Sequence, residues 1–247
     1  MKKCHPAYCP NCFATILLLT VFLTACIQRT NPQDDPYKSL RGKMVKEQIE
    51  ARGITNEKVL AAMHKVERHR FVPDNLVKHA YQDHPLPIGY NQTISQPYIV
   101  AFMTETLQPG KNDRILEIGT GSGYQAAILA EICDSVFSIE IVEALGNASE
   151  KLLKSLGYHN VKVKTGDGYN GWPEYSPFDA IIVTCAPTHV PEPLVKQLKE
   201  GGKMIIPVGG SEVQHLVLLK KSKGRLIQHS VLPVRFVPMV DEKHQTY

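Results

Sequence analysis

Apolar positions follow two different rhythms along the chain, one up to about residue 107 and another from Arg114 onward. In the first part apolar residues recur near helical spacing, and glycine or proline separates the segments. Residues 82–93 hold two prolines and a glycine, and we expect a loop there. Ser95 is suited to cap the helix after this loop, since Pro97 would lie in its first turn. The pattern predicts helices over residues 38–52, 56–66, 74–81 and 98–107.

From Arg114 short apolar runs alternate with amphipathic segments of helical spacing. Strands are expected at 115–118, 136–139, 161–164, 180–183 and 203–208, helices at 124–132, 143–156 and 193–199, and a closing hairpin at 213–220 and 225–234. Alternation of this kind predicts a parallel sheet with helices on both faces. The fold class is therefore α/β, a doubly wound, Rossmann-like sheet with N-terminal helices and a C-terminal antiparallel hairpin.

A length of 247 residues suits one such domain with short extensions. The formal net charge is only +4, and Lys2 and Lys3 supply two of these charges at the extreme N-terminus. No basic stripe remains along the rest of the chain, so we expect no nucleic-acid partner.

The N-terminus resembles an export signal. After Lys2 and Lys3, residues 13–25 are apolar and uncharged, and small residues precede Cys26, as in bacterial lipoprotein signals. The alternative is an upstream extension before a start at Met44. The predicted division is a signal segment at 1–26, a linker at 27–37 and one domain at 38–247, with its helices at 38–107 and its cofactor-binding sheet at 112–240.

Four of the six cysteines lie within residues 1–26. Cys4, Cys9 and Cys12 lack a second ligand pair at zinc-site spacing, so no metal site is expected. Cys133 and Cys185 are interpreted as small buried hydrophobic residues.

A glycine-rich turn joins the first predicted strand to its helix. Gly119, Gly121 and Gly123 follow the pattern G-x-G-x-G, whereas dinucleotide enzymes have G-x-G-x-x-G. Glycines allow a ligand to approach the backbone closely. Alone, this loop is a weak signal.

Two acidic positions strengthen the prediction that the glycine loop binds a ligand. Glu140 ends the second strand, where a carboxylate can accept hydrogen bonds from both ribose hydroxyls. Asp167 and Gly168 follow the third strand, where a carboxylate could accept a hydrogen bond from the adenine amino group. The carboxyl ends of parallel strands form the ligand-binding edge of such sheets. Together these residues fit an adenosine ligand without pyrophosphate, such as S-adenosylmethionine, although both carboxylates could instead be solvated loop residues.

The segments 80–89, 92–97 and 116–124 (AYQDHPLPIG, QTISQP and LEIGTGSGY) resemble the bacterial protein-L-isoaspartate O-methyltransferases. The similarity extends from about Met44 to Met239. It implies a class I methyltransferase fold and S-adenosyl-L-methionine as cofactor. It also implies methyl esterification of the free carboxylate of L-isoaspartyl residues in damaged proteins or peptides, which initiates their repair.

The resemblance also assigns roles to residues. Ser95 matches the active-site serine, and the N-terminal helices and the 82–97 loop are expected to cover the cofactor. Substrate-loop residues are Asp83, Thr93, Ile94 and Gln96, and cofactor-binding residues are Glu117, Gly119, Gly121, Gly123, Glu140, Asp167 and Gly168. We expect a monomer.

So sparse a site suits the chemistry. A sulfonium already activates the methyl group, and the nucleophile is a carboxylate with a reference pKa of about 4, so no strong base is needed. The enzyme must align the reacting atoms and exclude water. Ser95 is therefore assigned a positioning role, in which it donates one hydrogen bond to the substrate carboxylate.

Three alternatives stay open at this point: a methyltransferase for another carboxylate, a dinucleotide-dependent oxidoreductase, and a non-catalytic membrane-anchored binding protein. The indications of cellular localisation also disagree. Family and cofactor supply imply the cytoplasm, whereas a used signal and a lipid on Cys26 would place the protein in the periplasm, anchored to the membrane.

Overall fold

The computed structural model describes residues 1, 35–210, 212–243 and 245–247. The chain forms two units, Met1–Asp35 and Pro36–Tyr247. The signal segment, Cys26 and nearly all of the linker therefore lie outside the described residues. No helix in the described part of the chain is long and apolar enough to cross a membrane.

The second unit begins with the predicted helices. The first is one helical stretch in three parts, α1 (Lys38–Lys43), η1 (Met44–Ile49) and η2 (Glu50–Arg52), and it ends at Gly53, whose φ of 94° only glycine adopts freely. Asn56 caps α2 (Glu57–Lys65) by accepting hydrogen bonds from the amides of Lys58 and Val59. The short turns η3 (Arg68–Phe71) and η4 (Asp74–His79) follow, so the third predicted helix is a 3-10 helix.

The expected loop at 82–93 is wrong in part, because it contains a small antiparallel hairpin. Strands β1 (Leu86–Gly89) and β2 (Gln92–Ile94) pair, with Leu86 opposite Ile94. Tyr90 and Asn91 turn the chain with φ values of 53° and 57°, as the two central residues of a type I′ turn do. Helix α3 (Pro97–Leu107) follows directly.

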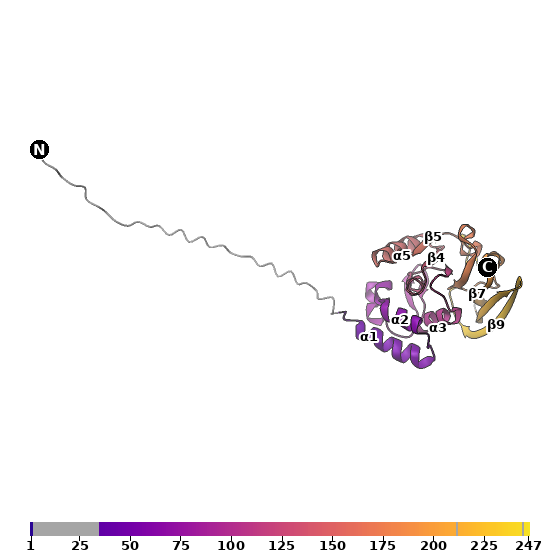
Figure 1. Ribbon diagram of the computed structural model, residues 1–247, viewed down its shortest axis with the longest axis horizontal. Helices are drawn as coiled ribbons and strands as arrows, with labels where there is room; N and C mark the ends of the chain where they lie inside the picture. The colour runs from indigo at the N-terminus through magenta and orange to yellow at the C-terminus, as the bar shows by residue number, and fades with distance from the viewer. Residues whose placement is uncertain (2–34, 211, 244) are drawn as a thin grey trace. The chain divides into compact units, whose positions relative to one another are not determined.

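Seven strands form the main sheet in the order β5-β4-β3-β6-β7-β8-β9. The parallel strands are β3 (Arg114–Ile118), β4 (Ser135–Glu140), β5 (Val161–Thr165), β6 (Phe178–Val183) and β7 (Leu198–Gly209). The hairpin β8 (Gln214–Ser222) and β9 (Arg225–Val234) adds antiparallel strands at one edge. Figure 1 shows β5 and β9 at opposite sides of the domain. The predicted doubly wound sheet and its closing hairpin are confirmed.

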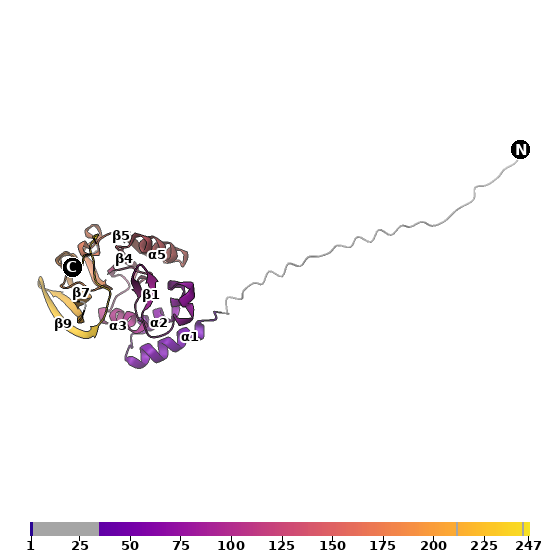
Figure 2. The ribbon, with the colours of Figure 1, turned by 180° about the vertical axis from the view of Figure 1, so that it is seen from behind.

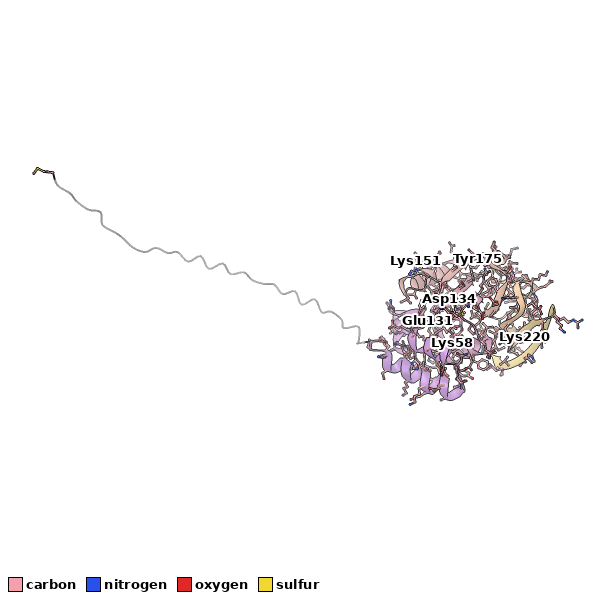
Figure 3. All side chains as sticks on the ribbon, viewed as in Figure 1. Lys58, Glu131, Asp134, Lys151, Tyr175 and Lys220 are labelled. Carbon is pink, nitrogen blue, oxygen red and sulfur yellow. The ribbon has the colours of Figure 1, made fainter. Side chains whose placement is uncertain are left out.

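Alternate residues of the strands face two apolar cores. One face packs against α2, α3, α4 (Tyr124–Ala130) and α5 (Glu143–Ser155), and Figure 2 shows the same arrangement from behind. The other face packs against α6 (Glu192–Gln197) and the short turns η5 (Gly168–Asn170) and η6 (Pro173–Tyr175). Charged side chains such as Lys58, Lys151 and Lys220 lie on the surface (Figure 3). Because the connections change face at β3, the ends of β3 and β6 border the crevice where such sheets bind ligands.

Candidate active site

The glycine loop after β3 lies tightly against its neighbours. The amides of Gly119 and Thr120 both donate to the carbonyl of Ile139 on β4, at 2.8 and 3.2 Å. Gly119 has a φ of 96°, and a Cβ there would lie 2.5 Å from Thr184 Oγ1. Gly121 has a φ of 52°, and Gly123, at 86°, is the N-cap residue of α4. These conformations explain the need for glycine.

Glu140 holds this loop from the end of β4. Its Oε2 accepts a hydrogen bond from the amide of Gly121 at 2.7 Å, and its Oε1 accepts one from the amide of Val142 at 3.0 Å. Burial raises the pKa of Glu140, and these amide donors oppose the shift. The amide of Ile141 is a third donor to this carboxylate, which still faces the pocket as an acceptor for a hydroxyl group.

Glu117 is on β3, next to the glycine loop, and it is not among the residues that line the two pockets. Its side chain is fully buried, and it accepts a hydrogen bond from Ser138 Oγ, which also contacts Thr120 Oγ1 at 2.6 Å. Its Oε1 is buried without a hydrogen-bond partner among the described residues. Burial raises the pKa of Glu117 to about 8, Ser138 opposes the shift, and Glu140 adds to it. A protonated Glu117 supports the loop without adding a second buried charge.

Asp167 begins the turn after β5 and has several protein donors. Its Oδ1 accepts the amide of Tyr169 at 2.9 Å, and its Oδ2 accepts Asn170 Nδ2 at 2.9 Å and the Tyr247 hydroxyl at 2.5 Å. One lone pair of Oδ1 remains. Gly168 packs against β3, where a Cβ would lie 2.3 Å from Cγ2 of Ile118.

A pocket runs along the carboxyl ends of these strands. Glycine backbone, the Glu140 carboxylate and apolar side chains form its walls: Ile118, Ile139, Cys185 and Met239. Cys185 is half-buried and packs against the second core while also lining this pocket, so its expected buried position is confirmed in part, and Cys133 is buried as expected. Of the predicted cofactor residues, Gly119, Gly121, Glu140 and Gly168 line this pocket, whereas Glu117, Gly123 and Asp167 do not. This donor set, with a glycine cradle and one carboxylate, fits an adenosyl group.

Asp83 organises the substrate loop. It accepts hydrogen bonds from Arg52 Nη1 at 2.7 Å, Gln96 Nε2 at 2.8 Å and the amide of Tyr98 at 3.4 Å. The Arg52 guanidinium carbon also lies 3.4 Å from the centre of the Tyr98 ring. The loop is thereby tied both to the first helical stretch and to the start of α3.

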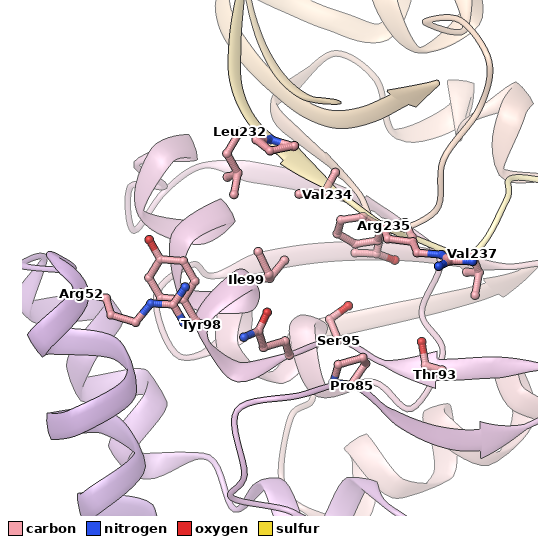
Figure 4. Close-up of a pocket in the computed structure, with 14 residues that line it drawn as sticks. Arg52, Pro85, Thr93, Ser95, Tyr98, Ile99, Leu232, Val234, Arg235 and Val237 are labelled. Carbon is pink, nitrogen blue, oxygen red and sulfur yellow. The ribbon is translucent and has the colours of Figure 1, made fainter. Parts of the chain in front are cut away.

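Ser95 does not cap α3, contrary to expectation. The N-cap residue is Gln96, which makes no side-chain capping bond. Ser95 instead turns its half-buried side chain toward a pocket of about 540 Å³ (Figure 4). Its hydroxyl has no hydrogen bond to any other residue that the structure describes, so it can donate to a ligand. Ile94 is 3% exposed and anchors the hairpin in the core.

The walls of this larger pocket include residues that the sequence analysis missed. They come from the end of β9 and the segment after it, with apolar Leu232, Val234 and Phe236 and the exposed cation Arg235 (Figure 4). Thr93 and Thr184 line this pocket and also the pocket along the strand ends that Glu140 lines. They line as well a small space between Ser95 and the glycine loop. The two pockets therefore meet at these threonines, where a group bound in one can reach a group bound in the other.

In the described part of the chain no group of three His, Cys, Asp or Glu residues is arranged to bind a metal. Cys4, Cys9 and Cys12 lie outside that part.

Comparison with known proteins adds three findings. Residues 39–244 match the family model described as protein-L-isoaspartate(D-aspartate) O-methyltransferase. The chain is 58% identical over 207 residues to protein-L-isoaspartate O-methyltransferase 1 of Nitrosospira multiformis, covering 82% of this chain and 88% of that protein. It is 52% identical over 238 residues to protein-L-isoaspartate O-methyltransferase 2 of Syntrophobacter fumaroxidans, covering 92% of this chain and 95% of that protein.

Two solved structures are similar to the chain as well. A structure titled protein-L-isoaspartate O-methyltransferase is 32% identical with a TM-score of 0.74, covering 80% of this chain and 65% of that one. The putative enzyme from Plasmodium falciparum, solved with S-adenosyl-L-homocysteine, is 28% identical with a TM-score of 0.71, covering 82% of this chain and 97% of that one.

Proposed function

The chain belongs to the protein-L-isoaspartate(D-aspartate) O-methyltransferase family, and from that premise we propose how its own residues carry out the reaction. The enzyme uses S-adenosyl-L-methionine to methylate the free carboxylate of L-isoaspartyl residues in damaged proteins or peptides, which initiates repair. The alternatives of an oxidoreductase and a non-catalytic binding protein do not fit this family.

The cofactor residues are the first part of the proposal. The backbone of Gly119 and Gly121 receives the cofactor, and the Glu140 carboxylate, which lines the same pocket, accepts hydrogen bonds from the ribose. Asp167 accepts the adenine amino group with the remaining lone pair of Oδ1 after a small reorientation, because its side chain lies beside the pocket. Glu117 and Gly123 act indirectly, by holding the loop and the start of α4.

Ser95 is the second part. When bound, S-adenosyl-L-methionine supplies a methyl group on a positively charged sulfur that leaves as a neutral thioether. Ser95 donates one hydrogen bond to one oxygen of the isoaspartyl carboxylate, and this directs the other oxygen toward the junction with the cofactor pocket. The apolar walls formed by Ile99, Val234 and Phe236 keep water from competing.

Arg52 stays paired with Asp83 and Tyr98 rather than with the substrate. A guanidinium paired directly with the isoaspartyl carboxylate would stabilise its charge before the reaction. That charge is lost as the ester forms, so the interaction would raise the barrier. In this proposal the exposed Arg235, which also lines the pocket, therefore does not pair with that carboxylate. A single neutral hydroxyl aligns the carboxylate at a smaller cost to its reactivity.

The unbonded Ser95 hydroxyl at the pocket junction carries this proposal. Ser95→Ala should reduce kcat with an isoaspartyl peptide by about tenfold or more, the effect of losing a hydrogen bond to a charged group. The dissociation constant for S-adenosyl-L-methionine should change less than twofold. Ser155→Ala, on the exposed side of α5, is the control and should match the unsubstituted enzyme. Unchanged turnover in Ser95→Ala would overturn the positioning role.

The remaining proposals concern the chain outside the site. Residues 13–25 act as a signal core and Cys26 as the lipidated residue; the apolar, uncharged run after Lys2 and Lys3 and the small residues before Cys26 support this. Lipidation is tested by growing cells with labelled palmitate: the protein should incorporate the label, and Cys26→Ser should abolish the incorporation.

The enzyme acts as a monomer, since one chain supplies both pockets. Measurement of its mass in solution tests this oligomeric state.

A further inference from the structure

Thr184 lies where the sheet changes direction, directly after β6. Its amide donates to the carbonyl of Ile118 at 2.9 Å, which extends the parallel pairing of β6 with β3 by one residue. Thr184 lines both the pocket of the glycine loop and the pocket of Ser95, and also the small space between Ser95 and the glycine loop. Among the described residues only Thr93 also lines all three of these spaces, and Thr93 is exposed on the hairpin.

The hydroxyl hydrogen of Thr184 is already committed. Oγ1 lies 2.7 Å from the carbonyl oxygen of Gly119 and 3.0 Å from that of Ile118, and its one hydrogen is shared between them. On its pocket side the hydroxyl can therefore only accept. The missing side chain of Gly119 is what allows this contact, because a Cβ there would lie 2.5 Å from Oγ1.

An oxygen acceptor at this junction suits one part of the cofactor. The positive sulfonium polarises the C–H bonds of its methyl group, and a C–H···O contact with a neutral oxygen is favourable by a modest amount. The thioether product has no such charge. A carboxylate in this position would attract the sulfonium more strongly, but it would also repel the substrate carboxylate that must reach the same methyl group.

The geometry points to Thr184 as a cofactor-recognition residue whose hydroxyl oxygen accepts from the sulfonium methyl group and so distinguishes S-adenosyl-L-methionine from S-adenosyl-L-homocysteine. This inference rests on the proposed function, since it requires the cofactor to lie along the glycine loop. It goes further by giving the enzyme a means to favour its substrate cofactor over its product.

Calorimetric titration of the full chain with each of the two compounds, without peptide, tests the inference. Thr184→Val has nearly the same shape but no oxygen, and it should lower the ratio of S-adenosyl-L-methionine affinity to S-adenosyl-L-homocysteine affinity by about two- to fivefold, as expected for one weak hydrogen bond. Thr184→Ser keeps the oxygen and should keep the ratio. Thr184→Ala, which also lacks the oxygen, should repeat the fall if the valine variant fails to fold.

A purely structural role gives a different result. Loss of the hydrogen bonds to Gly119 and Ile118 would weaken the binding of both compounds equally. An unchanged ratio of the two affinities in the valine and alanine variants would therefore overturn the inference. Failure of the unsubstituted chain to bind either compound would instead contradict the proposed function itself, and the inference with it.

Discussion

Glu140 Oε2 accepts a hydrogen bond from the amide of Gly121 at 2.7 Å, so the end of β4 holds the loop that follows β3. The same carboxylate accepts the amide of Val142 and lines the cofactor pocket. One side chain thus both shapes the loop and lines the pocket in which we propose that the cofactor binds, so its removal should affect both.

Glu140→Ala should weaken S-adenosyl-L-methionine binding by about 1.5–3 kcal/mol, roughly ten- to 150-fold, because charge-assisted hydrogen bonds to the ribose are lost. Equilibrium titration measures this. Glu143→Ala, an exposed carboxylate at the start of α5, is the matched control and should bind normally. Normal affinity in Glu140→Ala would remove the residue from the site.

Asp83→Ala should raise the KM for an isoaspartyl peptide and leave cofactor affinity nearly unchanged. The substitution releases Arg52, Gln96 and the amide of Tyr98 together, and such a loss is worth about 1–2 kcal/mol, or five- to 30-fold in kcat/KM. Steady-state kinetics with Asp74→Ala as an exposed control checks it. An equal loss of cofactor binding would contradict a role confined to the substrate loop.

The buried Glu117 predicts a pH effect on stability. Its folded pKa of about 8 lies above the ordinary value of 4.5, so the folded state binds the proton more tightly than the unfolded state. Its contribution is fully present below about pH 4.5 and is lost as the pH rises to about 8.

Glu117→Gln stays neutral and should not show this loss. Chemical denaturation of both proteins from pH 5 to pH 8.5 gives the difference in their free energies of unfolding. That difference should shift in favour of the glutamine variant as the pH rises. A difference that stays constant with pH would mean that Glu117 is ionised throughout.

Gly168→Ala should lower both stability and cofactor affinity, because the added methyl group would lie 2.3 Å from Cγ2 of Ile118 and force the turn after β5 away from β3. Overpacking of this kind costs about 1–3 kcal/mol. Gly42→Ala is the control, since a Cβ in this α1 position meets nothing within 4 Å, and it should be neutral or stabilising. Thermal melts with and without S-adenosyl-L-methionine separate the two effects, and a variant that melts like the unsubstituted enzyme would contradict the close packing.

Much of the fold could be predicted because buried parallel strands give continuous apolar runs, as in Ile181, Ile182 and Val183. The alignment of the glycine loop with Glu140 and Gly168 followed from the same logic, since all three follow neighbouring strands. The hairpin β1–β2 was missed because its strands are short and Pro87 interrupts one of them.

Ser95 was misplaced as a cap although a signal for the right answer was present. Pro97 at the first helical position makes Gln96 the N-cap residue. Thr184 directly follows β6, next to β3, so the same strand-end logic could have found it. The walls contributed by Leu232 and Phe236 could not be predicted in this way. They reach the site through tertiary packing at the edge of the sheet, and no local pattern in the sequence records it.

Methyl transfer from labelled S-adenosyl-L-methionine to a matched peptide pair tests whether the chain methylates isoaspartyl residues and whether Ser95 positions them. The two peptides differ only in having an isoaspartyl or an ordinary aspartyl residue at one position, and the unsubstituted full chain is compared with Ser95→Ala. The account predicts base-labile label on the isoaspartyl peptide alone, and much less of it with the variant. Equal labelling of both peptides, or none on either while the cofactor still binds, would contradict it.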